Sequence, residues 1–301
     1  MTLVPSLPSG ERIELPGQGP TFVRDFAGPP GAPAVILLHG LLATADLNWS
    51  ASYAALSRHV RVVAVDHRGH GRGLRSRRRF RLADCADDAV AVADILGLRT
   101  FVPVGYSMGG PIAQLVWHRH PARVDGLVLC ATSRNFRGHP RERLMFRSLA
   151  AADFMVRLTP AAAQRRLVER TLAHRMEGPW GEWAWSEFRR NDPVKMIEAA
   201  QALGRYTSHG WISDVNVPTA VVVTTHDRLV PARRQRKLAA SVPGATVHEV
   251  KGDHAVAVRE PSIFVPVLVD ACLDVIGRVR AGVEHEPAPS TSAGPASRGR
   301  Q

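Results

Sequence analysis

The stretch Phe101-Val102-Pro103-Val104-Gly105-Tyr106-Ser107-Met108-Gly109-Gly110 decides the fold of this 301-residue chain. An apolar run typical of a buried strand leads into a Gly-x-Ser-x-Gly motif, and a helical pattern follows directly. In this strand–turn–helix context the serine occupies a tight, strained turn that lifts its hydroxyl above a sheet. Gly105 and Gly109 leave room where side chains would strike the neighbouring strand and helix. The motif predicts Ser107 as a nucleophile.

Further apolar or β-branched runs lie on both sides of this stretch and predict strands. The predicted strands are 12–15, 21–26, 34–38, 61–66, 100–105, 126–131, 220–225 and 246–250. Runs such as Ala34–Leu38 and Ala220–Val223 show no alternation of apolar and polar residues. Such runs favour a parallel sheet buried on both faces, whereas the first two strands alternate and suggest an antiparallel edge.

Helical patterns separate most of these strands and are predicted at 82–96, 108–119, 231–241 and 261–280. Alternating strands and helices predict an α/β fold with a mostly parallel, eight-stranded sheet flanked by helices. The segment 135–211 breaks this alternation with helical patterns alone, and we expect it to be a helical cap insertion. The core then comprises 11–134 and 212–282, and the Pro/Ser/Ala/Gly-rich tail 284–301 is expected to be disordered.

Two further polar positions follow predicted strands, as Ser107 does. Asp227 lies after the strand 220–225, and His254 lies after the strand 246–250. A histidine there can take the proton of Ser107, and a carboxylate can orient the imidazole and stabilise its charged form. Nucleophile, acid and base follow one another along the chain as Ser, Asp and His, which is the order found where the nucleophile lies on a strand–turn–helix. Asp253 is a rival for the acid, but adjacent side chains usually point apart, so we prefer Asp227.

The stretch His39-Gly40-Leu41 ends the first long apolar strand and predicts an oxyanion hole. A loop here places a main-chain N–H opposite the one that follows the nucleophile, so we assign the donors to Leu41 and Met108. Gly40 supports this loop, as Gly105 and Gly109 support the turn around Ser107. The side chain of His39 is expected to be a structural hydrogen-bonding group.

A glycine- and arginine-rich loop follows the strand 61–66. We expect Asp66 and Arg68 to lock this loop, and the seven arginines from Arg68 to Arg81 to form a solvated surface patch. His67 and His70 have no carboxylate–histidine set of metal-site spacing around them, and the Gly-x-x-x-x-Gly-Lys phosphate-binding pattern is missing. No metal and no cofactor are therefore predicted.

The composition of the chain excludes several classes of protein. The net charge is +12, from 39 basic and 27 acidic residues, and lysine occurs at three positions only. A bias of the genome toward arginine codons explains this better than nucleic-acid binding, because no nucleic-acid-binding motif is present. No apolar run suits a membrane span, and residues 1–10 do not resemble a signal peptide. We expect a cytoplasmic protein with a small-molecule partner and no stable membrane insertion, and homo-oligomerisation stays open.

The motifs together resemble the α/β-hydrolase superfamily over roughly residues 20–280. The matched elements are His39-Gly40, Asp66-x-Arg68-Gly69-x-Gly71, Gly105-x-Ser107-x-Gly109-Gly110, Asp227 with Val230-Pro231, and His254 with Glu260-Pro261. The layout is similar to the branch of this superfamily with a helical cap, which includes esterases, lactonases, cofactor-free haloperoxidases and carbon–carbon bond hydrolases. The sequences of residues 46–49 and 67–73 resemble those of actinobacterial proteins. Ser107 distinguishes the chain from epoxide hydrolases and haloalkane dehalogenases, which use aspartate there.

The resemblance implies a serine hydrolase that cleaves a carboxylic ester, lactone or thioester of a small to medium apolar substrate through an acyl-enzyme. Two alternatives use the same three residues: perhydrolysis or haloperoxidation, and carbon–carbon hydrolysis with Arg189 or Arg190 holding a substrate carboxylate. A third is a non-catalytic binding protein. The aromatic residues of 135–211, among them Phe146, Phe154 and Phe188, could line an apolar acyl pocket or form the core of the cap.

Overall fold

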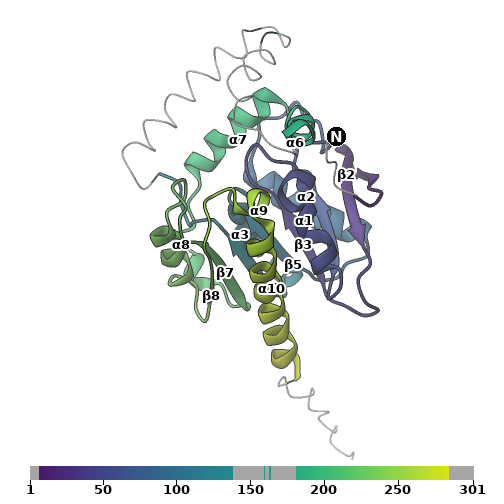
Figure 1. The fold of residues 1–301 in the computed structure, drawn as a ribbon. Helices are drawn as coiled ribbons and strands as arrows, with labels where there is room; N and C mark the ends of the chain where they lie inside the picture. The colour runs from purple at the N-terminus through teal and green to yellow at the C-terminus, as the bar shows by residue number, and fades with distance from the viewer. Residues whose placement is uncertain (1–6, 138–158, 160–162, 164–180, 285–301) are drawn as a thin grey trace, which may run out of the picture.

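Eight strands build the sheet in the computed structural model, which describes residues 7–137, 159, 163 and 181–284 (Figure 1). They are β1 (Glu11–Leu15), β2 (Gly19–Phe26), β3 (Ala34–Leu38), β4 (Arg61–Val65), β5 (Val102–Tyr106), β6 (Leu127–Cys130), β7 (Thr219–Thr224) and β8 (Thr246–Val250). Their order across the sheet is β1-β2-β4-β3-β5-β6-β7-β8. The pairs β1–β2 and β2–β4 are antiparallel, and the other pairs are parallel. The predicted α/β fold and its antiparallel edge are confirmed.

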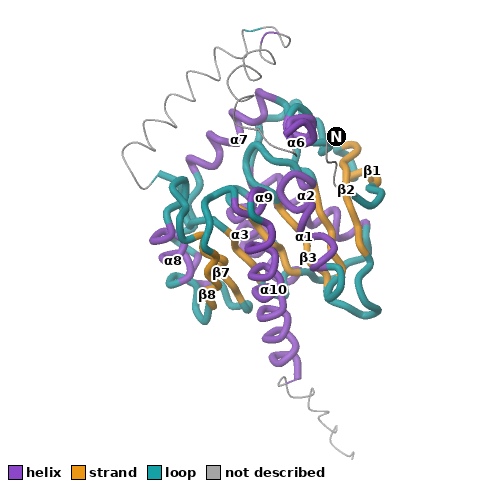
Figure 2. The backbone as a smooth tube through the Cα atoms, viewed as in Figure 1, coloured by secondary structure: helices purple, strands orange, loops and turns teal. Residues whose placement is uncertain are grey.

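The helices cover both faces of the sheet (Figure 2). They are α1 (Ala45–Leu56), α2 (Leu82–Ile95), α3 (Gly109–Arg119), α6 (Gly181–Phe188), α7 (Pro193–Arg205), α8 (Ala232–Ala239), α9 (Val256–Arg259) and α10 (Pro261–Glu284), with short 3₁₀ turns η1 (Pro121–Arg123) and η3 (Ile212–Asp214). One apolar cluster joins the sheet to α2, α3 and α8, and a second joins it to α1, α9 and α10.

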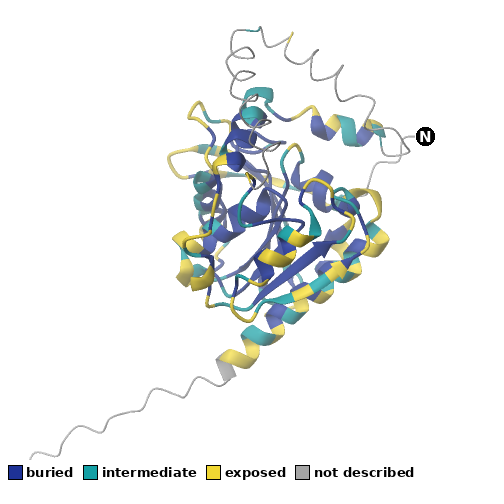
Figure 3. Cartoon of the chain, turned by 90° about the vertical axis from the view of Figure 1, so that its left-hand side faces the viewer, coloured by how far each residue is buried: buried dark blue, intermediate teal, exposed yellow. Residues whose placement is uncertain are grey.

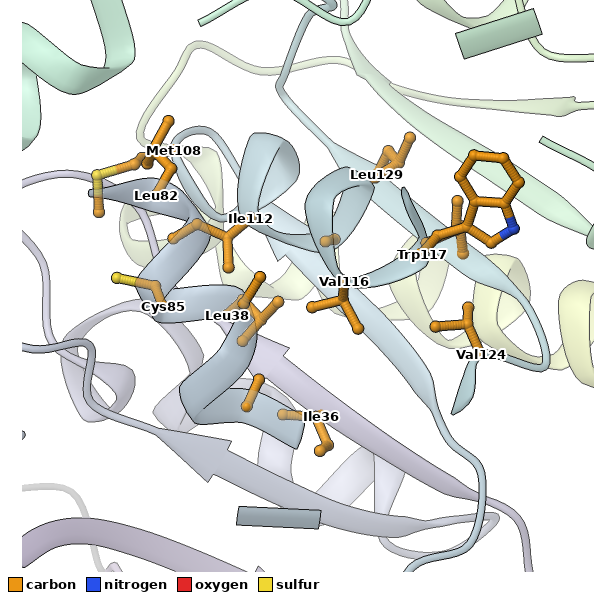
Figure 4. Packing of buried hydrophobic residues seen from close by; sticks show 14 of the residues in the cluster. Ile36, Leu38, Leu82, Cys85, Met108, Ile112, Val116, Trp117, Val124 and Leu129 are labelled. Atoms are coloured by element: carbon orange, nitrogen blue, oxygen red, sulfur yellow. The ribbon is translucent and has the colours of Figure 1, made fainter. Parts of the chain in front are cut away.

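Strand β3 shows why the sheet is buried on both sides. Ile36 and Leu38 belong to the cluster with α2 and α3, while Val35 and Leu37 belong to the cluster with α1 and α10. Successive side chains of a strand point to opposite faces, so a continuous apolar run is needed when both faces are covered. Figure 4 shows Ile36 and Leu38 packed near Ile112 and Val116 of α3, and Figure 3 shows burial concentrated in the sheet and the inward helix faces.

Helix α1 is a described helix of the core that the sequence pattern did not predict, and the short α9 is another. Its buried face carries polar residues, among them Asp46, Asn48 and Ser52, so apolar periodicity does not mark it. Partners from distant parts of the chain make this burial tolerable: Arg24 Nε lies 2.6 Å from Asp46 Oδ1. The helix begins after Thr44, whose Oγ1 accepts a hydrogen bond from the Leu47 N–H at 3.0 Å.

Between β6 and β7 the described residues contain α6 and α7, which lie at one end of the sheet (Figure 1). Residues 181–205 are called the cap segment below. The predicted cap 135–211 also includes residues 138–158, 160–162 and 164–180, with Phe146 and Phe154, and these lie outside the described residues. The predicted disordered tail lies outside them too, apart from its first residue, which ends α10. Phe188 is buried and stacks on Trp185 within α6.

The three cysteines of the chain lie in the core. Cys85, Cys130 and Cys272 are free thiols and all three are buried in the core, where burial raises their pKa values. None of the helices in the described part of the chain combines the length and the apolarity that a membrane span needs.

Candidate active site

Parallel pairing brings four loops to the same edge of the sheet. Strands β3, β5, β7 and β8 run in one direction, so the segments after Leu38, Tyr106, Thr224 and Val250 all leave from their carboxyl ends. This is where an open α/β sheet presents its site residues. The loops contain the predicted residues Leu41, Ser107, Asp227 and His254.

The turn at Ser107 is strained and tightly enclosed. Ser107 has φ of 51°, which is the left-handed region that favours glycine. Its main-chain N–H donates to the Cys130 carbonyl at 2.9 Å, and its carbonyl accepts from Thr132 Oγ1 at 2.8 Å. These bonds hold the residue in a conformation that it would otherwise leave.

Glycines make this turn sterically feasible. A Cβ on Gly105 would lie 2.2 Å from the Gly109 carbonyl oxygen, and one on Gly109 would lie 2.0 Å from the Leu38 carbonyl oxygen. Neither distance is tolerable for real atoms, so both positions require glycine, as the motif predicts. Gly110 is equally restricted, because a Cβ there would lie 2.3 Å from Thr132 Oγ1.

The structure brings the side chains of Ser107, His254 and Asp227 into one hydrogen-bonded row. Ser107 Oγ lies 2.9 Å from His254 Nε2, and His254 Nδ1 lies 2.7 Å from Asp227 Oδ2. Ser107 is 8% exposed, and the carboxylate of Asp227 is fully buried. In this geometry the imidazole can accept the serine proton while the carboxylate fixes which ring nitrogen carries hydrogen.

Further donors hold the carboxylate of Asp227 in place. Its Oδ1 accepts from the N–H groups of Leu229 and Val230, each at 2.8 Å. Its Oδ2 also accepts from Thr224 Oγ1 at 2.8 Å and Gln235 Nε2 at 3.2 Å. The orientation of the carboxylate is therefore set before a substrate arrives.

The rival acid Asp253 points elsewhere. Its Oδ1 accepts from the Ala255 N–H at 2.7 Å, and its Oδ2 lies 3.3 Å from Arg259 Nη1. The loop that carries His254 is instead held from the nucleophile turn, because Tyr106 Oη donates to the His254 carbonyl at 2.9 Å. Sequence reasoning missed this role of Tyr106, although its place beside Ser107 was the available signal.

The loop after β3 lies directly beside the serine. A Cβ placed on Gly40 would lie 3.4 Å from Ser107 Cβ. The Gly40 N–H donates to Asn48 Oδ1 at 2.9 Å, which anchors the start of the loop. Among the described residues, neither the Leu41 nor the Met108 main-chain N–H has a hydrogen-bond partner. Both N–H groups thus remain available to an acceptor, in keeping with the predicted oxyanion hole.

His39 belongs to a buried cluster with His67 and His70 under this loop. Its Nε2 accepts from the His67 N–H at 3.0 Å, and its Nδ1 lies 2.8 Å from the Gly40 carbonyl, so it holds the loop structurally. Burial lowers the pKa of His39 to about 4 and that of His70 to about 3. Burial also lowers the pKa of His67 well below its usual value. Across the described residues, no three His, Cys, Asp or Glu side chains are grouped so that they could hold a metal ion.

Asp66 locks the arginine-rich loop as predicted. Its carboxylate accepts from the N–H groups of Ala45 at 2.7 Å and Arg72 at 2.8 Å. Arg68 holds the loop against α2, with its Nε 2.8 Å and its Nη2 2.6 Å from the two carboxylate oxygens of Asp88.

The prediction that the seven arginines from Arg68 to Arg81 are solvated is wrong for two of them. The side chains of Arg68 and Arg72 are 7% and 20% exposed. Arg72 pairs with Asp46 and, at 3.3 Å, with Glu187 of the cap segment. Carboxylates supplied by distant elements make such burial possible, and a sequence pattern does not reveal those partners.

The cap segment is tied to the rim of the sheet by polar side chains. Glu187 accepts from Thr44 Oγ1 at 3.1 Å. Asn191 Oδ1 accepts from the Gly71 N–H at 2.8 Å, and Asn191 Nδ2 donates to the Leu42 carbonyl at 3.2 Å. Sequence reasoning missed Asn191, because no motif surrounds it.

The fold and this row of side chains define a hydrolase built on an α/β sheet. The family model described as the alpha/beta hydrolase fold matches residues 33–261, and the chain belongs to that family.

Relatives and structures agree with this assignment. The chain is 28% identical over 244 residues to the carbamate hydrolase RutD of Agrobacterium fabrum, covering 77% of this chain and 90% of the relative. It is 26% identical over 271 residues to a poly(3-hydroxyalkanoate) depolymerase of Ectopseudomonas oleovorans, covering 85% and 90%. A hydrolase structure from Pseudomonas aeruginosa shares the fold with a TM-score of 0.74 and 22% identity, over 87% of this chain and 98% of that one.

Proposed function

We propose that the protein is a serine hydrolase that cleaves a carboxylic ester, lactone or thioester through an acyl-enzyme. The observation that carries this proposal is the 2.9 Å separation of Ser107 Oγ and His254 Nε2, with Asp227 behind the imidazole. A serine hydroxyl is a weak nucleophile until a positioned base takes its proton. The strained turn and the buried acid serve that activation, and neither is needed for a purely structural serine.

In the first half of the reaction, Ser107 Oγ attacks the acyl carbonyl while His254 accepts the proton. The developing oxyanion is stabilised by the N–H groups of Leu41 and Met108, and one such donor contributes about 3 kcal/mol in known enzymes. His254 then protonates the leaving oxygen or sulfur. In the second half it activates water, which attacks the acyl-enzyme and releases the acid. These steps use side chains and main-chain groups of the protein, and the proposal includes no cofactor.

The partner in this proposal is a small apolar acyl compound. The two relatives are named for a carbamate and a hydroxyalkanoate polymer, and both kinds of compound have an acyl carbonyl bonded to a heteroatom. In this proposal, the helical cap selects which acyl group enters the site. We also propose that the protein works in the cytoplasm as a soluble enzyme without nucleic-acid partners.

The test is a panel of esters, lactones and thioesters of graded acyl length, with a carbamate series alongside. The protein is expected to turn over at least one ester series, and Ser107→Ala should lose that turnover while unfolding at the same temperature. A fluorophosphonate probe should label the protein with the native serine and should not label Ser107→Ala. Unchanged turnover in that variant would overturn the proposal.

The position of Arg190 gives no support to carbon–carbon hydrolysis. Arg190, which could have held a substrate carboxylate, has its Nε 3.1 Å from Glu187 Oε1 and lines a recess that contains no residue of the Ser–His–Asp row. Labelling by fluorophosphonate would also separate an enzyme from a non-catalytic binding protein on the same fold. Peroxide-dependent halogenation in the absence of ester turnover would favour the haloperoxidase alternative instead.

A further inference from the structure

The recess that Arg190 lines contains no residue of the Ser–His–Asp row and is rich in arginine. Its volume is about 320 Å³, and its lining includes Arg12, Arg72, Arg75, Arg190 and Gln18. No residue that lines it is acidic, and none belongs to the Ser–His–Asp row or to the oxyanion loop. Figure 2 shows β1 and β2 beside α6, the elements that flank this part of the surface.

Carboxylates that do not line the recess partly neutralise two of the four guanidinium groups. Arg72 pairs with Asp46 and Glu187, and it stacks on the Phe22 ring at 4.0 Å from the ring centre. Arg190 shares the same Glu187, with its Nε 3.1 Å from Oε1. One cap carboxylate thus serves two arginines, so neither has a full counter-charge from it.

The other two guanidinium groups have no carboxylate partner among the described residues. Arg75 donates to the main-chain carbonyls of Gly71 and, at 2.8 Å, Arg190, and no carboxylate of the described chain forms an ion pair with it. Arg12 lies on the exposed edge strand β1 and makes no side-chain hydrogen bond or ion pair within the described chain. Burial lowers the pKa of Arg75, and the positive charge of Arg12 lowers that pKa further although Asp192 and Asp66 oppose it.

We propose that this recess is a binding site for a small phosphate-type anion, either inorganic or the phosphate group of a small metabolite. Guanidinium groups present planar pairs of N–H donors that match phosphate oxygens, and several of them in a recess without acidic side chains favour such a ligand. The side-chain amide of Gln18 adds a neutral polar group at the wall. The concave shape and small volume favour a small molecule over the extended backbone of a nucleic acid.

The site would join the cap segment to the sheet. Arg190 is the second residue after α6, whereas Arg12 belongs to β1 and Arg75 to the loop after β4. An anion held by these three residues bridges parts of the chain that also meet through the contacts of Glu187 and Asn191. Its binding is therefore expected to raise the stability of the docked cap segment, because a ligand of the native state alone stabilises that state.

The experiment is isothermal titration of the full-length protein with pyrophosphate and with inorganic phosphate, each against sodium chloride of matched ionic strength. We expect saturable binding with one site per chain and an increase in the unfolding temperature. Arg12→Gln should weaken binding about tenfold, as should Arg75→Gln, because each removes a charge-assisted hydrogen-bonding group. Arg12→Gln is the cleaner variant, since its side chain holds no described contact.

Matched controls are Arg58→Gln and Arg99→Gln, which remove exposed arginines that do not line the recess and should bind pyrophosphate as the native chain does. Ser107→Ala should bind equally well, which separates this proposal from the catalytic one. The proposal is overturned if no saturable binding exceeds the salt control, or if Arg12→Gln binds like the native chain. It is also overturned if fluorophosphonate modification of Ser107 abolishes binding, or if a DNA duplex or acidic vesicle binds through Arg12 and pyrophosphate does not compete.

Discussion

Asn191 of the cap segment donates a hydrogen bond to the carbonyl of Leu42, 149 positions away in sequence, at 3.2 Å. Leu42 has φ of 66°, a left-handed conformation that is costly for a branched residue. The loop is thus pinned at its start by Asn48 and at its far side by the cap segment. A side chain outside the sheet thereby sets the position of the loop that presents the Leu41 N–H.

We expect Asn191→Ala to lower kcat about tenfold with little change in KM, because a displaced N–H stabilises the oxyanion less in the transition state. Asn191→Asp is the matched variant: it keeps an acceptor for the Gly71 N–H and loses the donor to Leu42. It should be impaired at least as much as the alanine variant. Steady-state kinetics with an ester substrate measures both. If Asn191→Asp retains native kcat, the bond to Leu42 does not position the loop.

Replacement of Asp227 by asparagine tests the acid. The amide preserves shape but presents a donor toward the imidazole, which then takes the wrong tautomer to accept the serine proton. Loss of kcat by about four orders of magnitude is expected from such a change. The comparison is Asp253→Asn, which should leave kcat within about twofold because its side chain contacts Ala255 and Arg259. The reverse ranking of the two variants would assign the acid to Asp253.

The glycines of the turn give a prediction on stability. Gly109→Ala places a Cβ 2.0 Å from the Leu38 carbonyl oxygen and should lower the free energy of unfolding by about 3 kcal/mol or more, with loss of activity. Gly277→Ala, at an exposed position of α10, meets no atom within 4 Å and should raise that free energy by about 0.5–1 kcal/mol. Urea denaturation measures both changes. Equal tolerance of the two substitutions would mean that the turn around Ser107 can relax.

The histidine cluster predicts acid sensitivity of the fold. The pKa of His39 is lowered to about 4 by burial, so between pH 6.5 and about 4 the unfolded state binds a proton that the folded state does not. Stability is therefore complete above the unfolded pKa and decreases as pH falls through this window. His39 alone contributes on the order of 3 kcal/mol to the decrease. His70, with a pKa of about 3, adds to it down to lower pH.

The measurement is the free energy of unfolding between pH 7.5 and 4 for the native chain and for His70→Asn. The asparagine keeps a donor for the Arg68 carbonyl and cannot be protonated, so the pH dependence should become shallower. His59→Asn removes an exposed histidine and should leave the slope unchanged. An identical slope in all three proteins would exclude the buried cluster as the source.

Much of the fold was predictable because its strands are continuous apolar runs. All eight predicted strands occur, with ends that differ by no more than two residues, since burial on both faces leaves an unmistakable pattern. Helix α1 escaped prediction because Asp46, Asn48 and Ser52 interrupt its apolar face. Asp46 and Asn48 are buried against partners that Arg24 and Gly40 supply from outside the helix.

The sequence by itself determined the sheet, the strained turn at Ser107 and the candidate identities of Asp227 and His254. These depend on local features: glycines where no Cβ fits, and polar residues directly after apolar strands. Only the tertiary structure decided that Asn191 reaches Leu42, that Arg72 is buried against Glu187, and that Arg12 meets Arg75 around one recess. Such contacts join residues more than sixty positions apart, and their energy depends on where each partner lies in space.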